Sequence, residues 1–149
     1  MNIKNYTSSV PVINSISKIE FRLAQAGATH IAKSYEKEKP VGMIFQIPVN
    51  GIPLTFKLPA KIGKVTDFLI KQRSKPPKPD TKKTIELQAE RTAWKILADW
   101  IDIQVSIIQL DQAEPAEVFL PYSYNPASDQ TLFEMMNNNG FNQLTAGGE

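Results

Sequence analysis

TIELQAERTAWKILADWIDIQVSIIQL, residues 84–110, decides the fold because it carries the longest helical pattern in the chain. Its apolar residues recur at three- and four-residue steps in two adjacent stripes, at positions 85, 89, 93, 96, 100, 103, 107 and 110 and at 94, 97, 101, 105 and 108. So wide an apolar face predicts a central helix that is covered on more than one side. The remaining stripe is polar, and we expect it to face water: Gln88, Thr92, Lys95, Asp99, Asp102, Ser106 and Gln109.

The elements before this helix indicate the fold class. A first helix is predicted from about Val12 to Ala26, with Pro11 before it and Gly27 after it, each at the end that such residues favour. Three β-type runs follow: Thr29–Tyr35, Val41–Pro48 and Leu54–Leu58. Asn50-Gly51 between the last two predicts a hairpin, and residues 61–72 predict a short helix. We therefore expect an α+β fold, a three-stranded antiparallel meander packed by the N-terminal helix and the long C-terminal helix, with four strands if the N-terminus adds one.

The domain organisation follows from the proline content. The sequence SKPPKPDTKK at residues 74–83 contains three prolines, which disfavour helix and sheet interiors and predict an extended linker. Residues 114–125, EPAEVFLPYSYN, carry apolar side chains that we expect to close over the core. We predict a single domain at residues 1–136, containing this Pro- and Lys-rich linker, followed by a flexible tail at residues 137–149.

The charges are distributed very unevenly along the chain, although the net charge is only +2. Residues 1–60 carry seven bases and three acids, residues 61–83 eight and two, and residues 84–149 two and ten. The three parts therefore carry +4, +6 and −8. The sign changes at the start of the long helix, and the function must account for this division.

The composition excludes several classes of chemistry. The absence of cysteine excludes disulfides, thiolate nucleophiles, zinc ribbons and iron–sulfur clusters, and it fits a reducing cytoplasm. His30 is the only histidine, so a two-histidine metal site would need a second chain. The scattered glycines form no phosphate-cradling loop. There is neither a signal-peptide core nor a run of about 18 apolar residues that could span a membrane. We expect no cofactor and no membrane partner.

Two groups on the long helix could take part in chemistry. Asp99 and Asp102 could share a cation in a metal-dependent nuclease, but an ion pair between Lys95 and Asp99 is the better interpretation of their spacing. Trp94 and Trp100 could stack on bases if they were exposed, yet their place in the apolar stripes favours packing in the core. We therefore assign neither a catalytic residue nor a metal ligand.

The basic segment at residues 61–83 is the strongest functional lead. Clusters of this kind bind phosphate backbones because each neutralised phosphate releases condensed counterions. The competing interpretation is a solvated linker. The residues that we expect to contact nucleic acid come from this segment and, if they share a face with it, from the first helix: Lys64, Lys71, Arg73, Lys75, Lys78, Lys82 and Lys83, with Lys18 and Arg22.

The sequences QAERTAWKILADWIDIQ at residues 88–104 and VFLPY at residues 118–122 carry a family resemblance. Over about residues 10–135 the chain resembles an uncharacterised family of small proteins from bacteriophages, prophages and other mobile elements. The resemblance supplies no catalytic residues, and it implies a role in DNA replication or recombination, or in binding host proteins.

Together these observations predict a non-enzymatic accessory protein in the cytoplasm of a bacterial host cell. It would bind the backbone of DNA or RNA through residues 61–83. The alternative is a protein-interaction module in which the acidic C-terminal half binds a host factor or a second copy of the chain.

Overall fold

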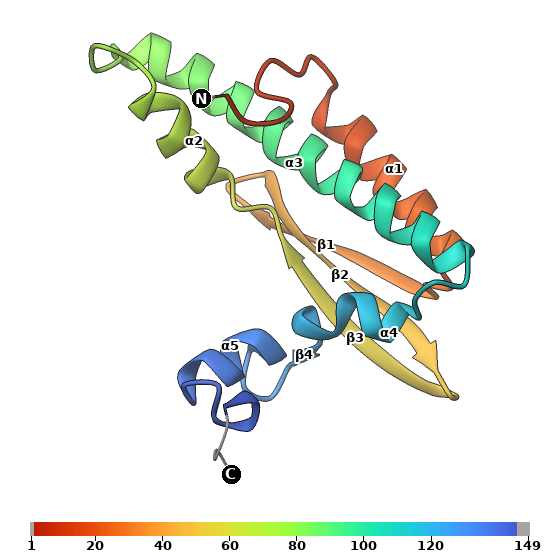
Figure 1. The fold of residues 1–149 in the computed structure, drawn as a ribbon. Coiled ribbons are helices and arrows are strands. Elements are labelled where there is room, and N and C mark those ends of the chain that lie inside the picture. The colour runs from red at the N-terminus through yellow and green to blue at the C-terminus, as the bar shows by residue number, and fades with distance from the viewer. Residues whose placement is uncertain (1, 146–149) are drawn as a thin grey trace.

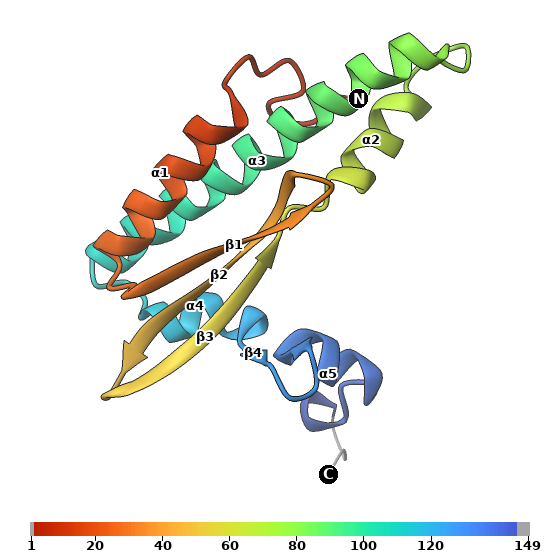
Figure 2. The same ribbon diagram turned by 180° about the vertical axis from the view of Figure 1, so that it is seen from behind.

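The computed structural model of the chain describes residues 2–145. The helices and strands follow in this order: α1 (Val12–Gln25), β1 (His30–Glu36), β2 (Lys39–Val49), β3 (Ile52–Pro59), α2 (Ile62–Lys71), α3 (Pro79–Gln109), α4 (Pro115–Phe119), β4 (Tyr124–Asn125), β5 (Gln130–Thr131) and α5 (Leu132–Asn138). Helices α1 and α3 run side by side in the same direction over one face of the main sheet (Figure 1), and the view from behind shows the same arrangement (Figure 2). The predicted α+β fold is confirmed.

The main sheet has three antiparallel strands in the order β1-β2-β3. The predicted hairpin between β2 and β3 is confirmed: Asn50 and Gly51 have φ values of 53° and 81°, as a tight turn with two left-handed residues requires. Residues 4–7 form a turn, so the fourth strand that the N-terminus could have supplied does not form. Instead, this N-terminal segment is hydrogen-bonded to α3, where Asn5 Nδ2 donates to Asp99 Oδ2 at 2.9 Å.

The core lies between the sheet and the two long helices. Its largest buried side chains are Ile19 and Leu23 of α1, Met43, Phe45 and Ile47 of β2, Phe56 and Leu58 of β3, and Trp94, Ile101 and Val105 of α3. Trp94 is fully buried and its Nε1 donates to the Pro40 carbonyl at 3.1 Å, which satisfies its one polar group. The prediction that Trp94 packs in the core is confirmed.

Residues 115–122 close the core beside β3, as predicted. Helix α4 packs against α3, and its last residue, Phe119, is fully buried. The Phe119 ring lies 5.3 Å from Phe45, 5.8 Å from Phe56 and 6.0 Å from Trp100, measured between ring centroids. This segment therefore joins the core through aromatic packing.

The predicted solvent-facing stripe of α3 is wrong in part: Ser106 and Gln109 are exposed, but Thr92 is buried and other members of the stripe contact α1 or the N-terminal segment. Thr92 is fully buried, and its Oγ1 donates to the Asn5 carbonyl at 2.8 Å. Asp102 pairs with Arg22 of α1. Polar side chains can lie between packed elements when each finds a partner there, and hydrophobic periodicity does not detect such partners.

The predicted linker at residues 74–83 is shorter than expected. Helix α3 begins at Pro79, because proline is favoured at the first helical position, where its missing N–H would have had no partner. Only residues 72–78 form the connection between α2 and α3, and these two helices pack together. Residues 61–83 thus form a helical hairpin, which we call the basic hairpin.

Part of the predicted tail, residues 137–149, has secondary structure. Helix α5 extends to Asn138, and the Phe141 ring packs 5.8 Å from the Phe133 ring. The last part of the predicted tail, residues 146–149, lies outside the described residues. Of the helices in residues 2–145, none combines the length and the apolar character that crossing a bilayer requires.

Candidate nucleic-acid interface

The basic hairpin presents all of its charged side chains to solvent. Its eight bases and two acids are all exposed. Within residues 2–145, none of these bases forms an ion pair, since no carboxylate oxygen lies within 4.0 Å of their charged nitrogens. The bases are Lys61, Lys64, Lys71, Arg73, Lys75, Lys78, Lys82 and Lys83, and the acids are Asp67 and Asp80.

The bases of residues 1–60 behave differently, because six of the seven are ion-paired. Most of their partners belong to the acidic C-terminal half. The pairs are Lys4–Asp99, Lys18–Asp102, Arg22–Asp102, Lys33–Glu20, Lys39–Glu90 and Lys57–Asp129. The fold therefore pairs four acids of the C-terminal half with bases of the first 60 residues, whereas the eight bases of the basic hairpin have no ion-pair partner within residues 2–145.

Lys18 and Arg22 do not join the basic hairpin. Arg22 Nε lies 2.8 Å from Asp102 Oδ1, and Nη2 donates to Ser106 Oγ at 2.9 Å. Asp102 lies 19 residues beyond Lys83 on α3, which corresponds to about 28 Å of helix. The Arg22 side chain is only 13% exposed. Its contacts serve the packing of α1 on α3, a role that sequence reasoning did not identify.

The positions of the lysines at the start of α3 oppose the helix dipole. Lys78 is the N-cap residue, Lys82 and Lys83 follow in the first turns, and Asp80 is the single acid of the first turn. A positive charge near a helix N-terminus costs about 0.3–1 kcal/mol, since the unpaired N–H groups there carry partial positive charge. The lysines at these positions therefore do not stabilise the helix. An anionic ligand bound at this end would interact favourably with both the lysine charges and the helix N-terminus.

The carboxylates considered for a nuclease, Asp99 and Asp102, are occupied by cations of the chain. Lys95 Nζ donates to Asp99 Oδ1 at 2.5 Å, which confirms the predicted ion pair. Burial raises the pKa of Asp99, but the hydrogen bonds from Lys95 and Asn5 and the charge of Lys95 outweigh it and hold that pKa below its ordinary value. Among residues 2–145, no group of three or more histidine, cysteine or acidic side chains is placed to hold a metal ion. Asp99 and Asp102 are thus engaged in ion pairs within the fold.

The Asp99→Asn variant should be less stable than the wild type by about 1–2 kcal/mol at neutral pH, because the Lys95 hydrogen bond to a charged acceptor is lost. The folded-state pKa of Asp99 is depressed, so its contribution is present above the unfolded value of about 3.9 and is lost as pH falls through the folded value. Urea denaturation at pH 7 and below about pH 3 should therefore show the difference shrinking in acid. Asp67→Asn, at an exposed position outside the ion pairs, is the control. An equal loss of unfolding free energy at both pH values would contradict the conclusion that the ionised Asp99 carboxylate stabilises the fold.

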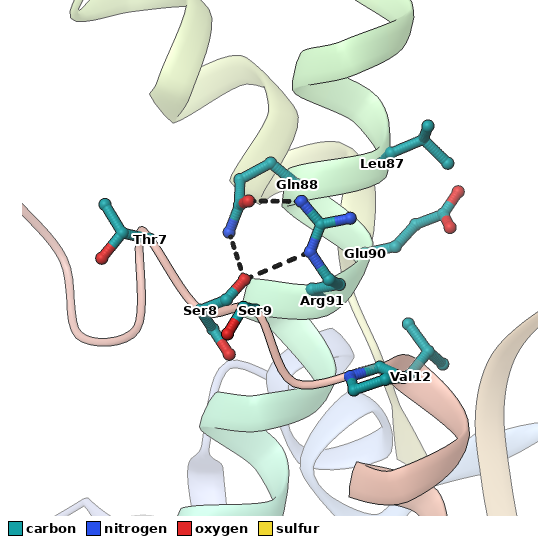
Figure 3. A pocket seen from close by; sticks show the side chains of 9 residues that line it. Thr7, Ser8, Ser9, Val12, Leu87, Gln88, Glu90 and Arg91 are labelled. Atoms are coloured by element: carbon teal, nitrogen blue, oxygen red, sulfur yellow. Dashed lines mark hydrogen bonds between the residues drawn. The ribbon is translucent and has the colours of Figure 1, made fainter.

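A hollow of about 440 Å³ lies between the N-terminal segment, the start of α1 and α3 (Figure 3). Arg91 Nε and Gln88 Nε2 both donate to the Ser8 carbonyl, at 3.1 and 3.0 Å. Arg91 also donates to Gln88 Oε1 at 2.5 Å. These hydrogen bonds hold the N-terminal segment on α3, so the polar side chains of this hollow have a structural role. The basic hairpin therefore remains the candidate interface.

Comparison with protein-family models, curated proteins and solved structures found no match to the chain. The resemblance to proteins of mobile elements therefore stays a prediction. The function has to be inferred from the residues and their geometry.

Proposed function

We propose that the protein binds the backbone of nucleic acid through the basic hairpin. The observation that carries this proposal is the contrast in ion pairing. Six of seven bases in residues 1–60 are paired inside the fold, whereas the eight bases of the hairpin are exposed and have no ion-pair partner within residues 2–145.

The chemistry of binding would be electrostatic. Lysine and arginine side chains displace condensed counterions from phosphates, which provides affinity without reading the base sequence. The two packed helices hold the bases on both arms of the hairpin, and the connecting loop, which turns at residues 72–75 and contains prolines at positions 76 and 77, carries three more. Such a protein would serve as a non-enzymatic accessory factor in the bacterial cytoplasm, in keeping with the predicted resemblance to proteins of mobile elements.

The proposal predicts strongly salt-dependent binding to DNA or RNA. With about six phosphate contacts, the observed affinity should fall roughly 10³-fold between about 50 and 200 mM salt. Fluorescence anisotropy with labelled single- and double-stranded DNA and RNA would measure this dependence. An absence of binding to all four at the lower salt concentration, or an affinity that does not change with salt, would overturn the proposal.

The alternative, docking of a protein through the acidic half, has less support. Glu90, Asp99, Asp102 and Asp129 are already paired with bases of the same chain. Among residues 84–145, the acids without an ion pair number five, fewer than the charge of −8 suggests: Glu86, Asp111, Glu114, Glu117 and Glu134.

A further inference from the structure

A second hollow, of about 430 Å³, lies where β3, α2 and α3 meet, at the base of the basic hairpin. Its wall is largely apolar and includes Leu97, Trp100 and Tyr122. Lys61 and Lys64 also line it, and no acidic side chain does. Apolar hollows of this size with a few polar groups are typical of sites for small molecules.

The aromatic side chains of this hollow are held in place by the core. The Trp100 ring lies 5.6 Å from the Tyr122 ring and 6.0 Å from the Phe119 ring, with interplanar angles of 66° and 73°. Trp100 is partly exposed, whereas Trp94 is fully buried. The prediction that Trp100 packs in the core is therefore confirmed only in part, because part of the side chain remains accessible in the hollow.

The lysines of the hollow give it a charge preference. Lys61 and Lys64 are exposed, they have no ion pair within residues 2–145, and they are the first two bases of the basic hairpin. Lys61 also lines two neighbouring hollows together with Lys57. An apolar, aromatic wall with cationic groups beside it complements a ligand that is both aromatic and anionic.

We infer that the hollow receives an unstacked nucleobase of a single strand, whose phosphate is neutralised by Lys61 and Lys64. The inference rests on the proposed function, since it extends the surface of the basic hairpin into the hollow. Stacking on aromatic rings beside a basic track is how proteins bind single strands with little sequence preference. A duplex keeps its bases stacked and would contact the hairpin alone, so the protein prefers single strands.

Tryptophan fluorescence tests this assignment in the wild-type chain. A short oligothymidylate should quench the emission of Trp100, while an abasic oligomer with the same number of phosphates should bind through the hairpin and leave the emission unchanged. The Trp100→Phe variant, which keeps an aromatic ring, shows how much of the signal belongs to Trp100. Buried Trp94 supplies the constant background.

The affinity test uses Trp100→Ala, with its folding checked by circular dichroism. Its affinity for the oligothymidylate should fall about tenfold, and its affinity for a duplex should not change. Lys75→Gln, on the hairpin loop, should weaken both equally. Equal quenching by the abasic oligomer, no quenching by the oligothymidylate, or an equal loss of both affinities in Trp100→Ala would overturn the inference and leave backbone binding intact. A failure of every oligomer to bind would remove the proposed function with it.

Discussion

Replacing Lys71, Lys75, Lys78 and Lys82 with glutamine is expected to weaken nucleic-acid binding roughly 10³-fold at about 0.1 M salt. Each phosphate contact changes the observed affinity about eightfold for a tenfold change in salt, and the effects of separate contacts multiply. The four lysines are exposed and lie on α2, the loop and the first turn of α3, so their removal should leave the core unaltered. Anisotropy titrations at several salt concentrations would measure the affinity and the slope of its logarithm against the logarithm of the salt concentration, which should be smaller than for the wild type.

A matched control removes the same number of charges from the other part of the chain. The quadruple glutamine variant of Lys4, Lys18, Lys33 and Lys39 has the same net charge as the hairpin variant, but it loses residues that are ion-paired within the fold. The four lysines are 39–67% exposed, and ion pairs made by surface lysines contribute about 0–1 kcal/mol each, so this control should fold and retain most of the affinity. If the two variants lost affinity equally, net charge rather than the basic hairpin would be responsible.

The basic segment could be recognised from the sequence because its signal is local. Eight bases within 23 residues can be read from the sequence without knowing the fold. Which bases are neutralised could not be predicted, because the pairs join residues far apart in the chain: Arg22 meets Asp102 across 80 positions. For the same reason, the sequence does not show whether Lys18 and Arg22 share a face with the basic hairpin, and the structure places both at Asp102, in the distant part of α3.

The fold could be predicted where the side-chain pattern has a clear period or a clear turn signal. The predicted strands agree with β1, β2 and β3 to within about two residues, because Asn50-Gly51 and the alternating pattern define the meander. The polar stripe of α3 was misread because Thr92 finds its partner on the N-terminal segment. The hollow beside Trp100 could not be foreseen either, since Tyr122 is brought to it by the return of the chain along β3.

Replacing Phe119 with alanine is expected to cost about 3–5 kcal/mol of unfolding free energy, the largest effect of a single substitution that we predict. Phe119 is fully buried, and its ring contacts Phe45 and Phe56 of the sheet and Trp100 of α3. Truncation would leave a cavity between two strands and a helix, and these elements are tied to one another by further packing, so they cannot simply move together to fill it. Urea denaturation, with the midpoint and slope fitted together, would measure the loss.

The neighbouring residue supplies the control for this experiment. Leu120 follows directly in the same segment and its side chain is 50% exposed, so Leu120→Ala should change the unfolding free energy by no more than about 1 kcal/mol. A small effect at both positions would mean that α4 is not part of the cooperative core. A large effect at Phe119 alone would show that residues 115–122, far from the sheet in sequence, are needed to complete the core. Because Phe119 packs directly against the Trp100 ring, such a result would also show that the wall of the hollow beside Trp100 and Tyr122 is supported by the cooperative core.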